Sequence, residues 1–252
     1  MLQGFFKALR HAFDQAVKGA DQGDRGGRNW DAQISGCTTV LARDLDPGTR
    51  SDILRKRGDA YFRKTQYGMH QDEAPALISF ALADYNEAIR INPDNALAYC
   101  SRAEVNWHDF TNDKYSRVKI CIENYSEAIR RDPRLAKAYY GRAILWSDTE
   151  KYFKDIDKAI ELDPHNSNYN SSRSYVNNKL GRTSSAIDDL SKATAASGGI
   201  GRRYRAFLYE KQGLLDKALA DLNVDLKEDE GSCFEIEYLS RASVYIKMGK
   251  IE

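Results

Sequence analysis

The chain has 252 residues, of which 42% are hydrophobic and 30% are charged. That composition is too apolar for a disordered chain and polar for one compact globule, so it favours an elongated fold with much surface. A net charge of +1 gives the protein no general electrostatic reason to bind nucleic acid or an anionic membrane.

Residues 1–29 are predicted to form an N-terminal amphipathic helix and a flexible joint. The apolar side chains on one side of the helix are Leu2, Phe5, Phe6, Leu9, Phe13 and Val17, and four glycines follow in residues 19–27. Because so large a stripe is unfavourable in water, we expect it to cap the first repeat or to lie in the groove of the chain. Membrane association is the rival hypothesis, since basic residues flank the stripe.

No secretory leader or membrane span is predicted. Charge interrupts the first ten residues too early for a signal-peptide core, and no stretch approaches the ~18 apolar residues needed to cross a bilayer. The cysteines are too few and too scattered for a disulfide framework, and we expect them to be reduced and partly buried. They are Cys37, Cys100, Cys121 and Cys233. These features predict a cytoplasmic protein.

Two sequence signatures recur through residues 30–252. The first is an Arg followed by a small residue and, four positions after the Arg, by an aromatic residue or Asn. Its copies begin at Arg57, Arg102, Arg142, Arg173, Arg205 and Arg241, at intervals of 45, 40, 31, 32 and 36 residues. The second signature is an Asp or Asn before an apolar residue, then an Ala–Ile pair and a Pro. Its copies begin at Asp84, Asn124 and Asp155, with degenerate ones at Asp189 and Asp221.

Each repeat is predicted to be a pair of helices. Apolar residues recur close to every 3.6 positions, and the second helix ends just before a Pro, which cannot continue it. Small residues stand where two helices need to approach closely, at Gly58, Ala88, Ala103, Ala128, Ala143 and Ala159. Residues 30–44 are predicted to be the lone second helix of a preceding unit. No sustained alternation of polar and apolar residues indicates a strand.

This pattern resembles the tetratricopeptide repeat (TPR), a helix–turn–helix unit of about 34 residues, and most of all its bacterial-type variant. The resemblance covers residues 30–252 and implies an all-α, right-handed superhelical solenoid of about five two-helix repeats with partial units at both ends. The chain departs from the family in length. The first repeat is enlarged near residues 67–74 and the second near residues 109–116. Such insertions are expected in loops on one edge of a solenoid.

The repeated Arg and Asp are interpreted as ion pairs inside each hairpin rather than as a ligand site, because they recur with the hairpin itself. The planar guanidinium suits such a pair, since it makes two parallel bonds to a carboxylate. Arg142 with Asp155 and Arg173 with Asp189 are the best candidates. Asn124 opposite Arg102 keeps an acceptor but loses the charge.

Nothing in the sequence predicts an enzyme, a metal site or a cofactor. The histidines, which are His11, His70, His108 and His165, lie far apart and are each expected to be solvated. Metal sites need clustered ligands, and no metal-binding pair of histidines, nucleophile elbow or phosphate-binding glycine loop is present.

The resemblance to TPR proteins implies that the first helix of each pair lines a concave groove. The residues predicted to form a binding site there are Trp107, Tyr140, Ile144, Tyr175 and Phe207, with Arg55 and Arg203 at the rim. Tyr and Trp are frequent anchors of protein interfaces. The alternative is that some of these side chains merely pack between repeats. A TPR subclass grips chaperone C-termini through Lys, Asn and Arg, but Leu97, Cys100, Ser101, Lys137, Tyr140 and Ile144 stand at the comparable positions here.

The sequence therefore predicts a non-catalytic scaffold that binds a peptide or a partner helix in its groove. Two alternatives stay open. One is a structural protein that self-associates through its C-terminal end, and the other is the regulatory module of an enzyme whose catalytic part is absent. If the groove does not bind, the two enlarged loops are the next candidates.

Overall fold

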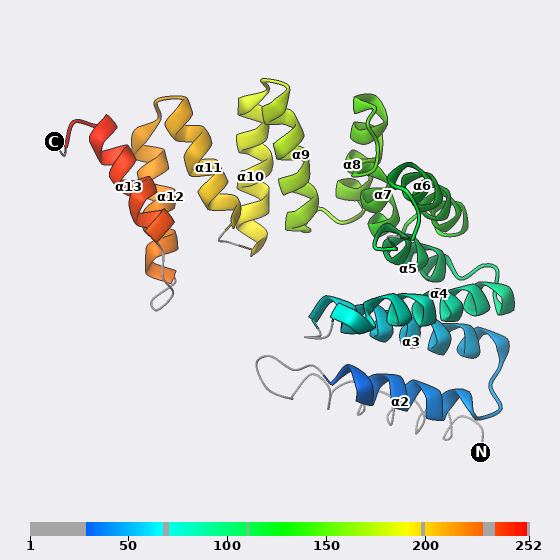
Figure 1. Ribbon diagram of the computed structural model, residues 1–252. Helices are drawn as coiled ribbons and strands as arrows, with labels where there is room; N and C mark the ends of the chain where they lie inside the picture. The colour runs from blue at the N-terminus through cyan, green and yellow to red at the C-terminus, as the bar shows by residue number, and fades with distance from the viewer. Residues whose placement is uncertain (1–28, 68–70, 110, 198–199, 229–234, 251–252) are drawn as a thin grey trace, which may run out of the picture. The chain divides into compact units, whose positions relative to one another are not determined.

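The computed structural model describes residues 29–67, 71–109, 111–197, 200–228 and 235–250 (Figure 1). The predicted N-terminal amphipathic helix, residues 1–28, and Cys233 lie outside these ranges. Within them, all regular structure is helical, as the repeats predict. The chain divides after Ser147 into two compact units.

Antiparallel helix pairs build the first unit. Its helices are α2 (Trp30–Leu41), α3 (Pro47–Tyr67), α4 (Ala74–Ile91), α5 (Ala96–Trp107), α6 (Lys114–Arg131) and α7 (Ala136–Ala143), with a 3₁₀ turn, η1 (Gln71–Glu73), before α4. Helices α3 and α4 pack as one hairpin and α5 and α6 as the next, while α2 packs on α3 as the lone second helix that the sequence predicts (Figure 1). Helix α5 contacts both α3 and α7, so the first helices of the pairs share one face.

The second unit repeats this arrangement. Its helices are α8 (Thr149–Leu162), α9 (Ser167–Lys179), α10 (Thr183–Ser197), α11 (Ile200–Lys211), α12 (Leu215–Glu228) and α13 (Glu235–Lys247). Helices α9 and α10 form one hairpin and α11 and α12 another, and α13 packs on α12 (Figure 1). The turn inside each hairpin passes through a glycine with positive φ, +75° at Gly181 and +74° at Gly213, a conformation that other residues adopt only with strain.

The second helix ends just before a proline, as the sequence predicts, and a polar side chain caps the start of the next helix. Helix α4 stops at Ile91, and Asn92, in front of Pro93, has an extended backbone. The side chain of Asn95 then accepts a hydrogen bond from the Ala98 amide and so caps the start of α5. These short connections place each second helix against the first helix of the next pair.

The core consists of small residues facing large ones. Ala88, Ala103 and Ala128 are fully buried, and the rings of Tyr85 and Tyr125 fill the space between helices. A close approach explains the glycine at position 58. A Cβ atom there would lie 2.8 Å from Cε1 of Tyr85. The predicted close-approach positions are thus confirmed as packing positions.

Four of the repeated arginines bond to the second helix of their own hairpin. Arg57, Arg173 and Arg205 form ion pairs with Asp84, Asp189 and Asp221 of their own hairpins, at 2.7, 2.5 and 2.6 Å. Arg102 donates to Oδ1 of Asn124 over 2.7 Å, as the sequence predicts. Arg142 and Asp155 belong to different units, and their pairing stays a prediction.

The same arginines also reach back to the preceding repeat. Their Nη1 atoms donate to the second helix that comes before each hairpin: Arg57 to Thr38, Arg102 to Asn86, Arg142 to Ser126, Arg173 to Asp157, Arg205 to Ser191 and Arg241 to Asn223. The guanidinium groups of Arg57, Arg102, Arg173 and Arg205 therefore connect neighbouring repeats as well as the two helices of one hairpin.

Three of the cysteines, Cys37, Cys100 and Cys121, are free and buried. Burial raises the pKa of the Cys37 thiol to about 11, so this side chain stays neutral. None of the described helices combines the length and the apolar character that crossing a membrane requires.

Candidate protein-binding surfaces

Helices α3, α5 and α7 form the predicted binding face of the first unit. Trp107 at the end of α5 is 38% exposed and Ile144, directly after α7, is 53% exposed, whereas Tyr140 is half-buried. The guanidinium of Arg117 lies 5.6 Å from the centre of the Trp107 ring. This face therefore presents two large apolar side chains to solvent, those of Trp107 and Ile144.

Internal ion pairs occupy much of the same face. Arg55 is not the open rim residue that its position in the repeat suggests, because its side chain is only 14% exposed and pairs with Asp59 over 2.6 Å. The Tyr85 hydroxyl donates to the other oxygen of Asp59. Between α5 and α7, Lys137 pairs with Glu104 over 2.8 Å. Burial opposes the charge of Lys137, but Glu104 nevertheless holds the pKa of the ammonium above its usual value.

Helices α9 and α11 form the corresponding face of the second unit, which is more aromatic. Tyr175 is 50% exposed and Phe207 is 44% exposed. Each ring lies beneath a lysine one turn further along its own helix, with Lys179 Nζ 4.7 Å from the centre of the Tyr175 ring and Lys211 Nζ 4.8 Å from that of Phe207. The same aromatic–lysine pair thus recurs in two successive repeats.

A hollow of about 270 Å³ lies beside Phe207. Its lining residues are Arg203, Tyr204, Ala206, Phe207, Glu210, Leu222 and Ser240. The ring of Tyr204 stacks on that of Phe207 at 6.2 Å. Glu210 accepts hydrogen bonds from Ser243 and Lys247 of α13, and although burial opposes its charge, these partners keep its pKa below the usual value.

The structure thus distributes the predicted site over two units. Arg55, Trp107, Tyr140 and Ile144 lie on the face of the first unit, and Tyr175, Arg203 and Phe207 lie on that of the second. That all of them line one continuous groove stays a prediction.

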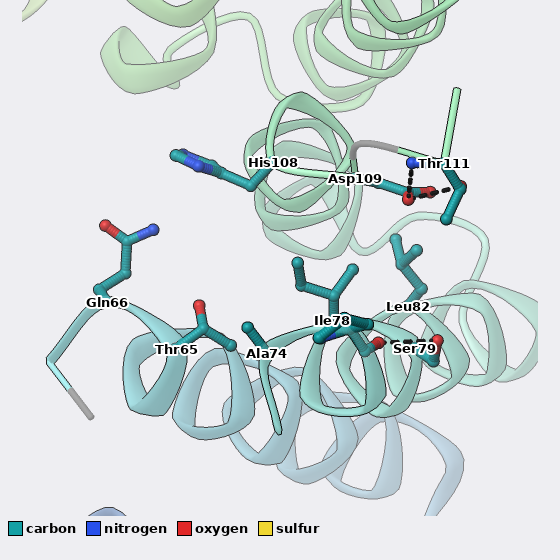
Figure 2. A pocket seen from close by; sticks show the side chains of 10 residues that line it. Thr65, Gln66, Ala74, Ile78, Ser79, Leu82, His108, Asp109 and Thr111 are labelled. Atoms are coloured by element: carbon teal, nitrogen blue, oxygen red, sulfur yellow. Dashed lines mark hydrogen bonds between the residues drawn. The ribbon is translucent and has the colours of Figure 1, made fainter. Parts of the chain in front are cut away.

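A cavity of about 460 Å³ lies at the two enlarged loops of the first unit (Figure 2). It is lined by Thr65, Gln66, Ala74, Pro75, Ile78, Ser79, Leu82, His108, Asp109 and Thr111. Figure 2 shows Ile78 and Leu82 pointing from α4 toward the loop that carries Asp109 and Thr111. The side chain of Asp109 is held by bonds from the amide and the hydroxyl of Thr111, at 3.1 and 2.6 Å.

Residues 79–108, which span most of α4 and all of α5, match the family model of the TPR repeat. These residues are a tetratricopeptide repeat, and the helix pairs of both units have the fold of such repeats. A comparison with curated protein sequences finds no match. Proteins of the TPR class are generally protein-interaction scaffolds.

Solved structures share the TPR fold at low sequence identity. PilF of Pseudomonas aeruginosa is 15% identical with a TM-score of 0.65, over 82% of this chain and 87% of that one. PilW, a type IV pilus biogenesis factor, is 19% identical with a TM-score of 0.58, over 79% and 86%. The APC/C hetero-tetramer Cut9–Hcn1 is 14% identical with a TM-score of 0.61, over 96% of this chain and 43% of that one.

Sequence reasoning located the loops of this TPR protein but missed the cavity between them. The excess lengths near residues 67–74 and 109–116 were the available signal. The apolar wall formed by Ile78 and Leu82 gave none, because these residues continue the ordinary apolar spacing of α4. Among the described residues, no cluster of His, Cys, Asp and Glu could hold a metal ion.

His108 differs from the solvated histidine that the sequence predicts. Its ring is half-buried and lies 5.2 Å from that of Phe62. Burial lowers the pKa of His108, Glu104 opposes this effect, and Arg117 adds to it.

We expect the His108 resonance to titrate below about pH 6.5 in NMR spectra, with the resonance assigned by its loss in His108→Gln. Because the folded state disfavours the charged ring, this group stabilises the fold above about pH 6.5 and less so as the pH falls toward its folded pKa. The unfolding midpoint should therefore drop less on acidification in His108→Gln than in the wild type. A pKa at or above 6.5 would contradict the burial of this ring.

Proposed function

We propose that this TPR protein is a non-catalytic scaffold that binds an extended peptide or a partner helix on the face of its first helices. The observation that carries the proposal is the partly exposed rings of Tyr175 and Phe207 on successive first helices, the second of which lines a hollow. Large aromatic side chains in such positions supply most of the energy of many protein interfaces, because they bury a large area with few rotatable bonds. A cytoplasmic location stays part of the proposal.

The charges on these faces favour a partner with apolar anchors over a carboxylate-terminated peptide. In the first unit, Lys137 is neutralised by Glu104 and Arg55 by Asp59. In the second unit, the ammonium groups of Lys179 and Lys211 lie over aromatic rings, where they extend the contact surface. Binding should accordingly weaken only moderately with salt, unlike recognition of a phosphate backbone.

The test is selection of peptides from a random displayed library on the intact chain, followed by fluorescence anisotropy. We expect Tyr175→Ala with Phe207→Ala to weaken a selected peptide by at least about thirtyfold, because the loss of even one fully used anchor costs about 2 kcal/mol, which corresponds to that factor. Tyr115→Ala is the matched control, because Tyr115 is 80% exposed at the start of α6, a second helix. Its loss should leave affinity within about twofold.

Failure to select any peptide, or equal affinity of the double variant and the wild type, would contradict this proposal. Circular dichroism of both variants should show unchanged helicity, since both rings are partly exposed and neither belongs to the core.

A second candidate function, self-association through the C-terminal end, is favoured by helix α13. Tyr238, Leu239 and Ile246 on this helix are each more than half exposed. Light scattering over a hundredfold range of concentration tests this. Self-association predicts a mass that rises with concentration in the wild type but not in Leu239→Glu with Ile246→Glu, and a constant monomer mass rejects it.

A further inference from the structure

The cavity at the enlarged loops combines an apolar wall with an acidic surround. Ile78, Leu82, Ala74 and Pro75 contribute apolar surface, and about 460 Å³ falls within the ~300–1,000 Å³ of cavities that accept ligands. One carboxylate, that of Asp109, lines it, and the exposed residues Asp72 and Glu73 come directly before the lining residue Ala74. Thr65 and Gln66 at the end of α3 line the cavity, but none of the residues named above on the binding face of the first unit does.

The N-terminal segment joins the described structure beside this cavity. Trp30, the first residue of α2, lies under the guanidinium of Arg63 at 5.8 Å. Asp31 pairs with Lys64 over 2.9 Å, and Lys64 also approaches Glu73 at 3.8 Å. Thr65 and Ala74, which line the cavity, directly follow Lys64 and Glu73 in the sequence. The start of α2 is therefore fixed one residue away from two lining positions.

The linker is long enough for residues 2–18 to reach the cavity. Ten residues, 19–28, separate the amphipathic stripe from Asn29. A glycine-rich linker of that length spans about 17 Å on average and at most ~35 Å when extended. Attachment through so short a linker gives an effective concentration on the order of millimolar, so even a weak contact would be largely formed.

The chemistry of the segment complements that of the cavity. Its stripe includes Phe6, Leu9 and Phe13, which follow one another at helical spacing and suit the apolar wall. Basic residues beside the stripe, Lys7 and Arg10, match the carboxylates around the cavity.

We propose that residues 2–18 dock in this cavity of their own chain, with the stripe against Ile78 and Leu82 and the basic residues toward Asp72, Glu73 and Asp109. The contact closes the loop edge of the first unit and leaves the face of α3, α5 and α7 available. It is independent of the peptide-binding proposal, so each can fail alone.

Hydrogen–deuterium exchange of the full chain, read by mass spectrometry, tests the contact from both sides. Phe6→Ser with Phe13→Ser removes the stripe, and we expect amides in residues 74–82 and 108–112 to exchange at least fivefold faster. Gln3→Ser with Gln15→Ser alters polar positions of the same segment and should change nothing. Ala74→Trp fills the cavity from the other side, and we expect faster exchange in residues 2–18.

Several results would overturn the proposal. Unchanged exchange in residues 74–82 after loss of the stripe would do so. A change confined to α3, α5 and α7 would place the segment in the groove instead, and protection that disappears on dilution would assign it to a second copy of the chain. The wild type could instead bind phosphatidylserine vesicles while residues 74–82 exchange equally fast in the Phe6→Ser/Phe13→Ser variant and in the Gln3→Ser/Gln15→Ser variant. That combination would assign the stripe to a membrane surface.

Discussion

Arg173→Ala should lower the free energy of unfolding by about 3 kcal/mol, the lower end of what removing one partner of a buried ion pair costs. The side chain of Asp189 is only 5% exposed and receives three bonds from the guanidinium, at 2.5, 3.1 and 3.2 Å. Without Arg173 the buried carboxylate keeps the Asn177 amide as a donor, at 2.9 Å. Most of this lost stability therefore comes from leaving the Asp189 carboxylate buried without an opposite charge.

Asp189→Ala should cost about as much, and the double variant should cost much less than the sum of the two. Urea denaturation followed by circular dichroism gives all the free energies needed for the cycle. The matched control is the exposed pair of Lys158 and Glu161, which lies on α8 at 2.6 Å. Its removal should change stability by less than about 0.5 kcal/mol, because solvent screens the pair. Additive costs for Arg173 and Asp189 would show that these side chains do not stabilise each other.

Gly141→Ala should destabilise the first unit by about 2–3 kcal/mol, an unusually large effect for one added methyl group. A Cβ atom at this position would lie 2.5 Å from Cε1 and 2.7 Å from the hydroxyl oxygen of Tyr125. That ring is 5% exposed and packs in the cluster that contains Cys100, Cys121 and Ala138, so it has little space to move.

Gly181→Ala provides the comparison for Gly141, because nothing lies within 4 Å of an added Cβ there and only the positive φ opposes it. Its cost should be about 1–2 kcal/mol. Tyr125→Leu should make the Gly141→Ala change less harmful, since it removes the atoms that clash. Thermal unfolding of the four variants measures both effects. If the Gly141 variant unfolds like the wild type, the close approach of α7 to Tyr125 would be wrong.

The helix pairs and their ion pairs could be predicted because the repeats impose them locally. An Arg that recurs with an Asp in the partner helix has one geometry available in a hairpin, and Arg205 with Asp221 adopts it as well as Arg173 with Asp189 does. Small residues such as Ala103 mark close approaches for the same reason. These features depend only on the spacing of residues within one repeat, and that spacing can be read directly from the sequence.

Exposure on the binding faces was harder to predict, because it depends on partners outside the repeat pattern. Position in the repeat suggests that Arg55 is open to solvent, but its pairing with Asp59 covers it. His108 was expected to be solvated, yet Phe62 of α3 packs against it. The cavity was missed because its wall and its rim come from separate segments that only the fold brings together.

The backward reach of each repeated arginine makes the repeats within a unit thermodynamically dependent on one another. In repeat proteins, stability is approximately the sum of the intrinsic stability of each repeat and a coupling between nearest neighbours. A guanidinium that bonds its own hairpin and the preceding helix, as Arg102 does with Asn124 and Asn86, loses both sets of bonds when either repeat melts. Strong coupling of this kind suppresses partly melted states, so the helices of a unit should unfold in one cooperative step rather than fray repeat by repeat from an end.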